Sequence, residues 1–273
     1  MSEQPLTLMA VHAHPDDEGS GTGGVLARYA AEGVRTVLVT CTNGEQGDGP
    51  GGVKPGEPGH DGAAVTAMRL RELRESCRVL GVDHLELLGY HDSGMMGWPQ
   101  NEAPEAFWNT PVDEAAARLA ALMERYRPQV VVTYDEHGFY GHPDHIQANR
   151  VALAAAEATG IPERVYYVAV PRSMIAGFGE ILREAGINPP EPIENDEEFG
   201  TPDELVTTAV DCSAYVGQKF DSLAAHASQA ENIFFLNMGR ELFGRVFGQE
   251  MFVRAVDRTG TPVPEDDLFA GIR

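Results

Sequence analysis

Two short stretches of the sequence carry residue types that bind divalent metal ions. The first reads HPDD and begins at His14, and the second reads HPDH and ends at His145. A catalytic zinc site takes three protein ligands from His, Asp or Glu and leaves a fourth position for water. His14 and Asp17 could supply two ligands from one turn, because Pro15 restricts the chain between them. His145 could supply the third, since Pro143 is typical of the first turn of a helix.

Three glycines after the first stretch offer a competing interpretation. Gly19, Gly21 and Gly24 fit the G-x-G-x-x-G spacing of dinucleotide sites. Such a site needs its first glycine at the end of a strand and an acidic residue at the end of the second strand. Here residues 14–18 separate the expected strand from Gly19, and the second expected strand runs into Cys-Thr-Asn at 41–43. We therefore favour the metal site and interpret the glycines as allowing a tight turn close to a ligand.

The predicted secondary structure places both stretches at the same edge of a sheet. Short runs rich in Val, Leu and Tyr indicate buried strands at 6–13, 34–41, 84–89, 129–134 and 164–170. Helical patterns alternate with them at 23–32, 65–80, 112–126 and 143–159. This alternation predicts an α/β fold with a Rossmann-like, mostly parallel sheet flanked by helices. Functional groups gather beyond the carboxyl ends of such strands, where both stretches lie, so a role as mere helix caps is the weaker explanation.

Two long connections, 42–64 and 90–111, leave the same edge of the predicted sheet. Loops of that length inside a compact domain usually serve function or move. We expect them to border the site and to admit its substrate.

The last third of the chain, residues 172–273, mixes predicted helices with a strand. Helices are expected at 172–186 and 213–230, a strand at 250–256, and a surface loop in the acidic stretch 191–198. We interpret residues 1–273 as a single domain. Its Rossmann-like core would span 1–171, with residues 172–273 as a C-terminal α/β cap packed on it.

Composition narrows the classes of partner. Lys and Arg total 20 against 42 Asp and Glu, a formal net charge of −22, which repels nucleic acid and anionic membrane surfaces. No stretch resembles a secretion signal and no run of 18 apolar residues occurs, so we expect a cytoplasmic protein without membrane insertion. Three scattered cysteines indicate buried reduced thiols rather than a disulfide framework. Adaptation to high salt and assembly into a homo-oligomer stay open.

The two stretches together resemble a known family. AHPDDE at 13–18, paired with GHPDH at 141–145, is similar to the zinc-dependent de-N-acetylases named after LmbE and PIG-L. That family includes N-acetylglucosaminyl-inositol deacetylases and the mycothiol-conjugate amidase. The resemblance runs through most of 7–160, and KFDSLAAHASQ at 219–229 is similar to the family's late helix. It implies a Rossmann-like α/β domain, in agreement with the alternation above.

The resemblance also implies a role for each residue of the first stretch. His14, Asp17 and His145 would bind Zn²⁺, although Fe²⁺ suits the same ligand types. Asp16 would be the general base, because one carboxylate of the pair binds the metal and the other stays able to accept a proton from water. Glu18 would orient a ligand or cap the following helix.

Further roles follow from the same resemblance. His142 would protonate the leaving amine or stabilise the oxyanion, and Asp144 would orient its ring and raise its pKa. Tyr140 would donate its O–H to the oxyanion. Three residues are expected to contact hydroxyl groups of a sugar or inositol: Arg69, Asp92 and Glu45. For Arg69 the alternative is an ordinary pair with Glu72 on the face of a helix.

The function that these residues predict is hydrolysis of an N-acetyl group on an N-acetylglucosamine-type substrate, such as N-acetylglucosaminyl-inositol. A larger amide, such as a mycothiol S-conjugate or an antibiotic precursor, is the alternative within the hydrolases. By the resemblance, the conjugate amidases have a lysine at the position that Gly21 occupies here. This difference favours the N-acetylglucosamine-type substrate. A non-catalytic metal- or nucleotide-binding module is the alternative from another class. No structural zinc site requires Asp16, and the glycines are misplaced for a nucleotide.

Overall fold

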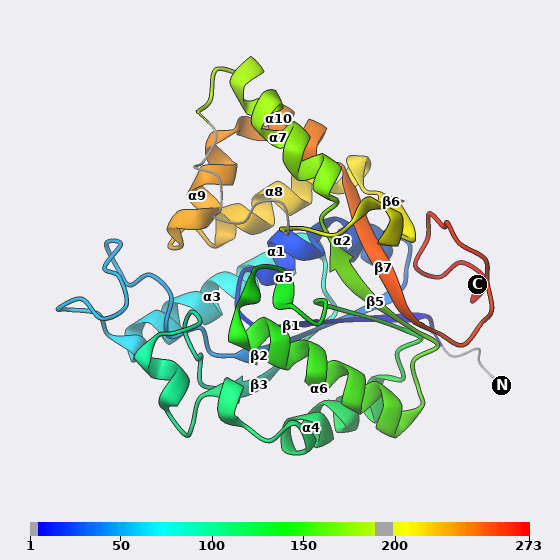
Figure 1. Cartoon of the computed structure of the whole chain (residues 1–273), viewed down its shortest axis with the longest axis horizontal. Helices are drawn as coiled ribbons and strands as arrows, with labels where there is room; N and C mark the ends of the chain where they lie inside the picture. The colour runs from blue at the N-terminus through cyan, green and yellow to red at the C-terminus, as the bar shows by residue number, and fades with distance from the viewer. Residues whose placement is uncertain (1–4, 189–198) are drawn as a thin grey trace.

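A computed structural model of the chain describes residues 5–188 and 199–273, so the predicted loop at 191–198 lies outside the described residues. Its centre is a seven-stranded sheet with the order β3-β2-β1-β4-β5-β7-β6 (Figure 1). The strands are β1 (Thr7–His12), β2 (Arg35–Thr42), β3 (His84–Tyr90), β4 (Val130–Thr133), β5 (Arg164–Ala169), β6 (Thr208–Asp211) and β7 (Gln249–Asp257). The first five are mutually parallel, and β7 and β6 are antiparallel to their neighbours.

Helices cover both faces of this sheet. They are α1 (Asp17–Gly21), α2 (Gly23–Ala31), α3 (Gly62–Leu80), α4 (Val112–Tyr126), α5 (Gly138–Gly141), α6 (Pro143–Thr159), α7 (Arg172–Glu184), α8 (Val216–Ala225), α9 (Ala230–Asn237) and α10 (Gly239–Phe247). Short 3₁₀ turns occur at Pro99–Glu102, Phe107–Asn109, Asp203–Leu205 and Ser213–Tyr215. The predicted α/β alternation is confirmed, and α4 and α6 have the predicted bounds.

The two faces follow from the alternation of side chains along β1. Leu8 and Ala10 pack against apolar side chains of α2 and α3 on one face. Met9 and Val11 pack against those of α4 and α6 on the other. Every residue of β1 is buried, because helices cover the strand on both sides. This packing fixes the position of β1, and the segment that follows β1 therefore leaves the sheet at a defined point.

Residues 172–273 extend the same sheet as well as covering it. β7 pairs with β5, and β6 pairs with β7. Three elements of this region were not predicted: β6, which has only four residues, α9 and α10. Cys41, Cys77 and Cys212 are buried and unpaired, in agreement with the expectation from composition.

The helix predicted at 213–230 ends early: α8 stops at Ala225, and an irregular turn at 226–229 leads into α9, which begins at Ala230 and was not predicted. No Gly or Pro marks the break, but the side chains between the two helices bond to distant elements. His226 lies 2.6 Å from Glu18, and Ser228 donates to Glu72 at 2.7 Å. These tertiary hydrogen bonds favour an irregular turn over continued helix. None of the described helices is both long and apolar enough to cross a membrane.

The three glycines of the rejected dinucleotide pattern lie against protein side chains. A Cβ on Gly24 would stand 2.6 Å from the Cβ of Cys212, and one on Gly19 would stand 2.9 Å from the hydroxyl of Ser222. Gly21 lies against His12. These contacts show that the glycines allow close packing of α1 and α2; that they allow a tight turn close to a ligand stays a prediction.

Candidate metal centre and active site

Two turns at the carboxyl edge of the sheet bring the predicted residues together. The first turn, residues 14–18, follows β1, and the second turn, residues 142–145, follows β4 through the short helix α5. β1 and β4 are adjacent parallel strands, so the segments that leave their carboxyl ends emerge side by side. Adjacency of the strands therefore explains why residues more than a hundred positions apart share one site.

His14, Asp17 and His145 meet between the two turns. The Asp17 Oδ2 lies 3.3 Å from the Nδ1 of His14, and its Oδ1 lies 3.6 Å from the Nε2 of His145. Burial alone would raise the pKa of Asp17, but the neighbouring His145 and His14 hold it well below its usual range. The carboxylate is therefore ionised and able to bind a cation.

Two other groups of three metal-binding residues share His14 with this trio. His14, His142 and His145 bring one ligand atom each within 4.8 Å of one another, and so do His14, Asp92 and Asp144. The predicted trio differs from the first group in using Asp17 in place of His142. We favour Asp17, because it is the anion in contact with both imidazoles and a dication gains most from an ionised ligand.

The ring of His145 indicates that this set of side chains suits a metal ion. The Nε2 of this buried side chain, 3.6 Å from Asp17, has no hydrogen-bond partner among the described residues. Buried polar atoms are normally paired, so the unpaired nitrogen points to a ligand. Burial lowers the pKa of His145 to about 4, which keeps the ring neutral and able to bind metal.

Asp16 lies beside this cluster in an unusual backbone conformation. Its φ of 106° lies in the left-handed region, which costs a non-glycine residue roughly 1–3 kcal/mol. One carboxylate oxygen lies 3.1 Å from the Arg69 guanidinium, and the other accepts from Asn232 at 3.3 Å. Burial raises the pKa of Asp16 to about 6, and Arg69 opposes that rise.

The contacts of Arg69 differ from those that the sequence predicted. Its guanidinium donates to the backbone carbonyls of Gly44 at 2.8 Å and Pro15 at 2.5 Å, besides contacting Asp16. The alternative pair with Glu72 does not form, since Glu72 accepts from Ser228. Gly44 has φ of 68°, and a Cβ there would lie 2.6 Å from the guanidinium. Arg69 thus ties the first turn to the loop after β2.

The expected relation between Asp144 and His142 is wrong. The Asp144 carboxylate accepts from the Ser93 N–H at 2.9 Å and from the Ser93 hydroxyl, and lies 3.2 Å from the Nε2 of His14. The His142 ring instead accepts the backbone N–H of Asp144 on Nδ1 at 3.2 Å. Burial, with His14 and His145 nearby, lowers the pKa of His142 rather than raising it. The carboxylate orients His14, and the helix N-terminus orients His142.

The remaining predicted residues border the cluster. Tyr140 is 44% exposed, with its ring centroid 5.1 Å from that of His145 and 6.0 Å from that of His142. Asp92 is buried, 3.7 Å from His14. Glu45 lies 2.6 Å from the exposed ring of His91, and its second oxygen is buried without a hydrogen-bond partner among the described residues. Asp92 and Glu45 thus come from the two long loops that were expected to border the site.

Tyr134 is a residue of the site that sequence reasoning missed. Its hydroxyl donates to Asp17 at 2.6 Å and accepts the N–H of Ala13 at 2.8 Å. Its ring stacks on that of His145 with centroids 4.1 Å apart. It directly follows β4, so the strand-end rule that selected the second turn could have found it.

Glu18 is fully buried under the first turn. It accepts the backbone N–H of Asp16 at 3.0 Å and is held by the Ser76 hydroxyl and by His226. Glu18 was expected to orient a ligand or to cap the following helix. Its carboxylate instead supports the backbone of the first turn at Asp16.

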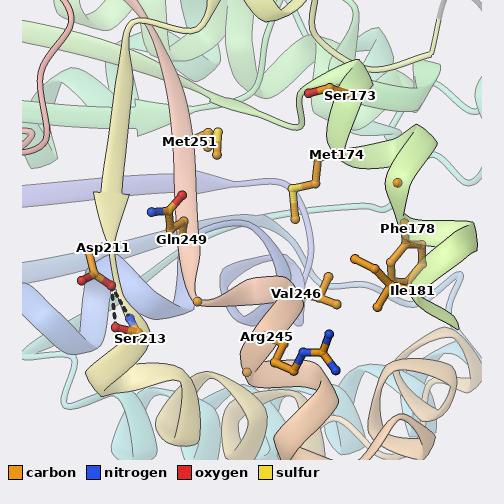
Figure 2. A pocket seen from close by; sticks show the side chains of 13 residues that line it. Ser173, Met174, Phe178, Ile181, Asp211, Ser213, Arg245, Val246, Gln249 and Met251 are labelled. Atoms are coloured by element: carbon orange, nitrogen blue, oxygen red, sulfur yellow. Dashed lines mark hydrogen bonds between the residues drawn. The ribbon is translucent and has the colours of Figure 1, made fainter. Parts of the chain in front are cut away.

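A hollow in the described surface lies away from these residues. It measures about 660 Å³ and opens between α7, α10 and the ends of β6 and β7 (Figure 2). Apolar side chains such as Met174, Phe178 and Val246 line it, and no residue of either turn does. The predicted site residues therefore lie outside this cavity.

Comparison with known proteins agrees with this geometry. The family model described as PIG-L, GlcNAc-PI de-N-acetylase, matches residues 9–156, which include both turns. The chain belongs to the PIG-L family. Membership confirms the expectation of a de-N-acetylase, a hydrolase of a carbon–nitrogen amide bond. A protein of Acidothermus cellulolyticus named 1D-myo-inositol 2-acetamido-2-deoxy-alpha-D-glucopyranoside deacetylase is 43% identical over 281 residues, covering 97% of this chain and 95% of its own.

Solved structures share the fold of this PIG-L protein at lower identity. An N,N'-diacetylchitobiose deacetylase from Pyrococcus horikoshii superposes with a TM-score of 0.58 at 20% identity, covering 91% of this chain and 83% of its own. A 4-carboxy-2-hydroxymuconate hydratase of Pseudomonas putida reaches 0.61 at 19% identity, covering 94% and 99%. A deacetylase and a hydratase on one fold show that the fold does not fix the reaction.

Proposed function

We propose that this protein is a metal-dependent deacetylase that hydrolyses the acetamide of an N-acetylglucosaminyl-inositol and releases acetate and the free amine. The observation that carries the proposal is a held carboxylate, Asp16, beside a cluster of His14, Asp17 and His145 whose atoms suit a metal ion. The deacetylase named for this substrate covers nearly the full length of the chain.

The cluster would hold Zn²⁺, with Fe²⁺ as the alternative that the same ligand types accept. His14, Asp17 and His145 would be its protein ligands, and Tyr134 would orient Asp17. When bound, the ion supplies Lewis-acid activation of a water molecule and of the amide carbonyl.

Asp16 would accept the proton of the attacking water. Arg69 and Asn232 contact its two oxygens and so fix the orientation of the carboxylate in advance. A positioned base of this kind contributes roughly 10²- to 10⁴-fold to the rate.

His142 and Tyr140 would donate hydrogen bonds to the carbonyl oxygen, and Asp16 would pass the proton that it accepts from water to the leaving amine. The Nδ1 of His142 accepts a backbone N–H, so the proton of the neutral ring resides on Nε2, where it can be donated. Tyr140 lies beside this ring with a partly exposed side chain, as a donor to the oxyanion requires.

Asp92 and Glu45 would accept hydrogen bonds from substrate hydroxyl groups. Both carboxylates lie at the edge of the cluster, and the orphaned oxygen of Glu45 supports a hydrogen-bonding ligand there. Arg69 would contribute chiefly through Asp16, given its bonds to that side chain and to two carbonyls.

The test is acetate release from N-acetylglucosaminyl-inositol, from N-acetylglucosamine and from a mycothiol S-conjugate, before and after chelation and with zinc restored. Chelator-sensitive turnover of the first substrate, restored by zinc, is expected. Turnover of the conjugate alone would contradict the deacetylase proposal in favour of the amidase alternative. Cytoplasmic location, homo-oligomer formation and the lack of nucleic-acid partners remain predictions.

A further inference from the structure

We propose that Asn232, on α9, is a positioning residue for Asp16, and that the junction of α8 and α9 thereby controls the reaction from outside residues 9–156, which the family model matches. This inference rests on the proposed function, in which Asp16 is the base. Residues 9–156 match the family model, so both helices lie beyond it.

The Asp16 carboxylate needs more than one partner to stay in one orientation. The backbone of Asp16 is left-handed and its carboxylate is half-buried, so the side chain would not hold one orientation without partners. Arg69 reaches one carboxylate oxygen at 3.1 Å. A single contact would leave the carboxylate able to rotate, so the second oxygen requires a second donor.

Asn232 supplies that donor in a fixed geometry. Its amide nitrogen donates to the second oxygen of Asp16 at 3.3 Å and to the backbone carbonyl of His226 at 3.4 Å. Both hydrogens of the amide are thus engaged, and the side chain is only 6% exposed. The amide is neutral, so it orients the carboxylate of Asp16 without raising its proton affinity, as a second carboxylate would.

The same junction supports the first turn at a second point. The His226 ring contacts Glu18 at 2.6 Å, and Glu18 accepts the backbone N–H of Asp16. Gln229, also in the junction, accepts the N–H of Asp48 at 2.9 Å and so holds the loop after β2. The junction therefore contacts the side chain of Asp16, the support of its backbone and a loop at the edge of the site.

The decisive variant is Asn232→Asp, which keeps the shape of the side chain but sets a carboxylate against Asp16. Displacing a reacting group by about 1 Å can cost roughly 100-fold, so we expect kcat to fall by about 10- to 100-fold. KM should change by less than about twofold, because Asn232 touches no predicted substrate contact. A purely structural role would lower the melting temperature and the fraction of active protein instead, leaving the kcat of the folded molecules unchanged.

The matched control is Asn237→Asp, the same chemical change on the exposed last residue of α9. Its kcat should stay within about twofold of the unmodified protein, and melting temperature and bound zinc are measured for both. If Asn232→Asp does not fold, the smaller and uncharged Asn232→Ser replaces it, with a several-fold loss of kcat expected. Equal kcat in the two Asn→Asp variants would overturn the inference.

Crystal structures of the two variants give a readout that does not depend on turnover. The Asp16 carboxylate should leave its place beside Arg69 in Asn232→Asp and keep it in Asn237→Asp. An unmoved carboxylate in the first variant would contradict the inference even if the unmodified protein released no acetate. Failure of the unmodified protein to deacetylate, with the carboxylate displaced as expected, would contradict only the proposed function.

Discussion

The two turns of the site share the letters H-P-D but use their aspartates in opposite ways. In the first turn the Asp16 side chain is 21% exposed, and its oxygens contact Arg69 and Asn232 from other elements. In the second turn the Asp144 side chain is fully buried and bonded to Ser93 and His14. The two carboxylates thus differ in exposure and in hydrogen-bond partners, although the sequence motif is the same.

Asp16→Asn gives the sharpest test of this contrast and the largest expected effect. Removal of the proton acceptor should lower kcat by about 10²- to 10⁴-fold, because an amide cannot act as a base. Bound zinc and melting temperature should stay close to those of the unmodified protein, since the amide keeps the size of the side chain. Steady-state kinetics with metal analysis measure both, and intact activity would rule out Asp16 as the base.

Asp144→Asn should show the opposite pattern. Replacing a buried, fully bonded carboxylate is expected to cost about 1–3 kcal/mol of unfolding free energy, because the Ser93 donors lose an ionised acceptor. Urea denaturation followed by circular dichroism measures this cost. A variant as stable as the unmodified protein would mean that the two aspartates are more alike than their burial indicates.

Tyr134→Phe tests the link between the two turns. The change removes the hydroxyl that donates to Asp17 and keeps the ring that stacks on His145. Loss of such an outer hydrogen bond typically weakens metal binding by about 10- to 100-fold. Competition with a chelator of known affinity measures zinc binding, and Tyr126→Phe, on α4 and bonded to Glu86, is a control in which zinc affinity should not change.

The smallest expected effect is a pH dependence of stability from the pair of Glu18 and His226. Burial would lower the pKa of His226, but Glu18 raises it above its ordinary value of 6.5. Burial would raise the pKa of Glu18, but His226 lowers it below 4.5. The stabilisation is therefore complete between about pH 4.5 and 6.5, and is lost as pH rises through the raised pKa of His226 or falls through the lowered pKa of Glu18.

The measurement is the difference in unfolding free energy between the unmodified protein and His226→Gln at several pH values. We expect it to be largest near pH 5.5 and to shrink by about 1 kcal/mol toward pH 9. A difference that stays constant with pH would contradict an ionised pair.

Much of the site could be predicted because strands and turns are local in sequence. The runs of Val and Leu predict β1 and β4, and Pro143 predicts where α6 begins. Once two parallel strands are adjacent, their carboxyl ends must meet, so strand adjacency alone is enough to bring His14, Asp17 and His145 together. The break between α8 and α9 could not be predicted, since it depends on bonds from His226 and Ser228 to residues far away in the chain.

By itself, the sequence determined the α/β alternation, the edge of the sheet where chemistry collects and the family to which the chain belongs. Only the tertiary structure decided what each polar side chain does there. It placed Arg69 and Asn232 against the carboxylate of Asp16, and it turned Asp144 from His142 to His14. The physical reason is that a polar group must find its hydrogen-bond partner within about 3 Å wherever the fold provides one, and motif spacing does not encode that partner.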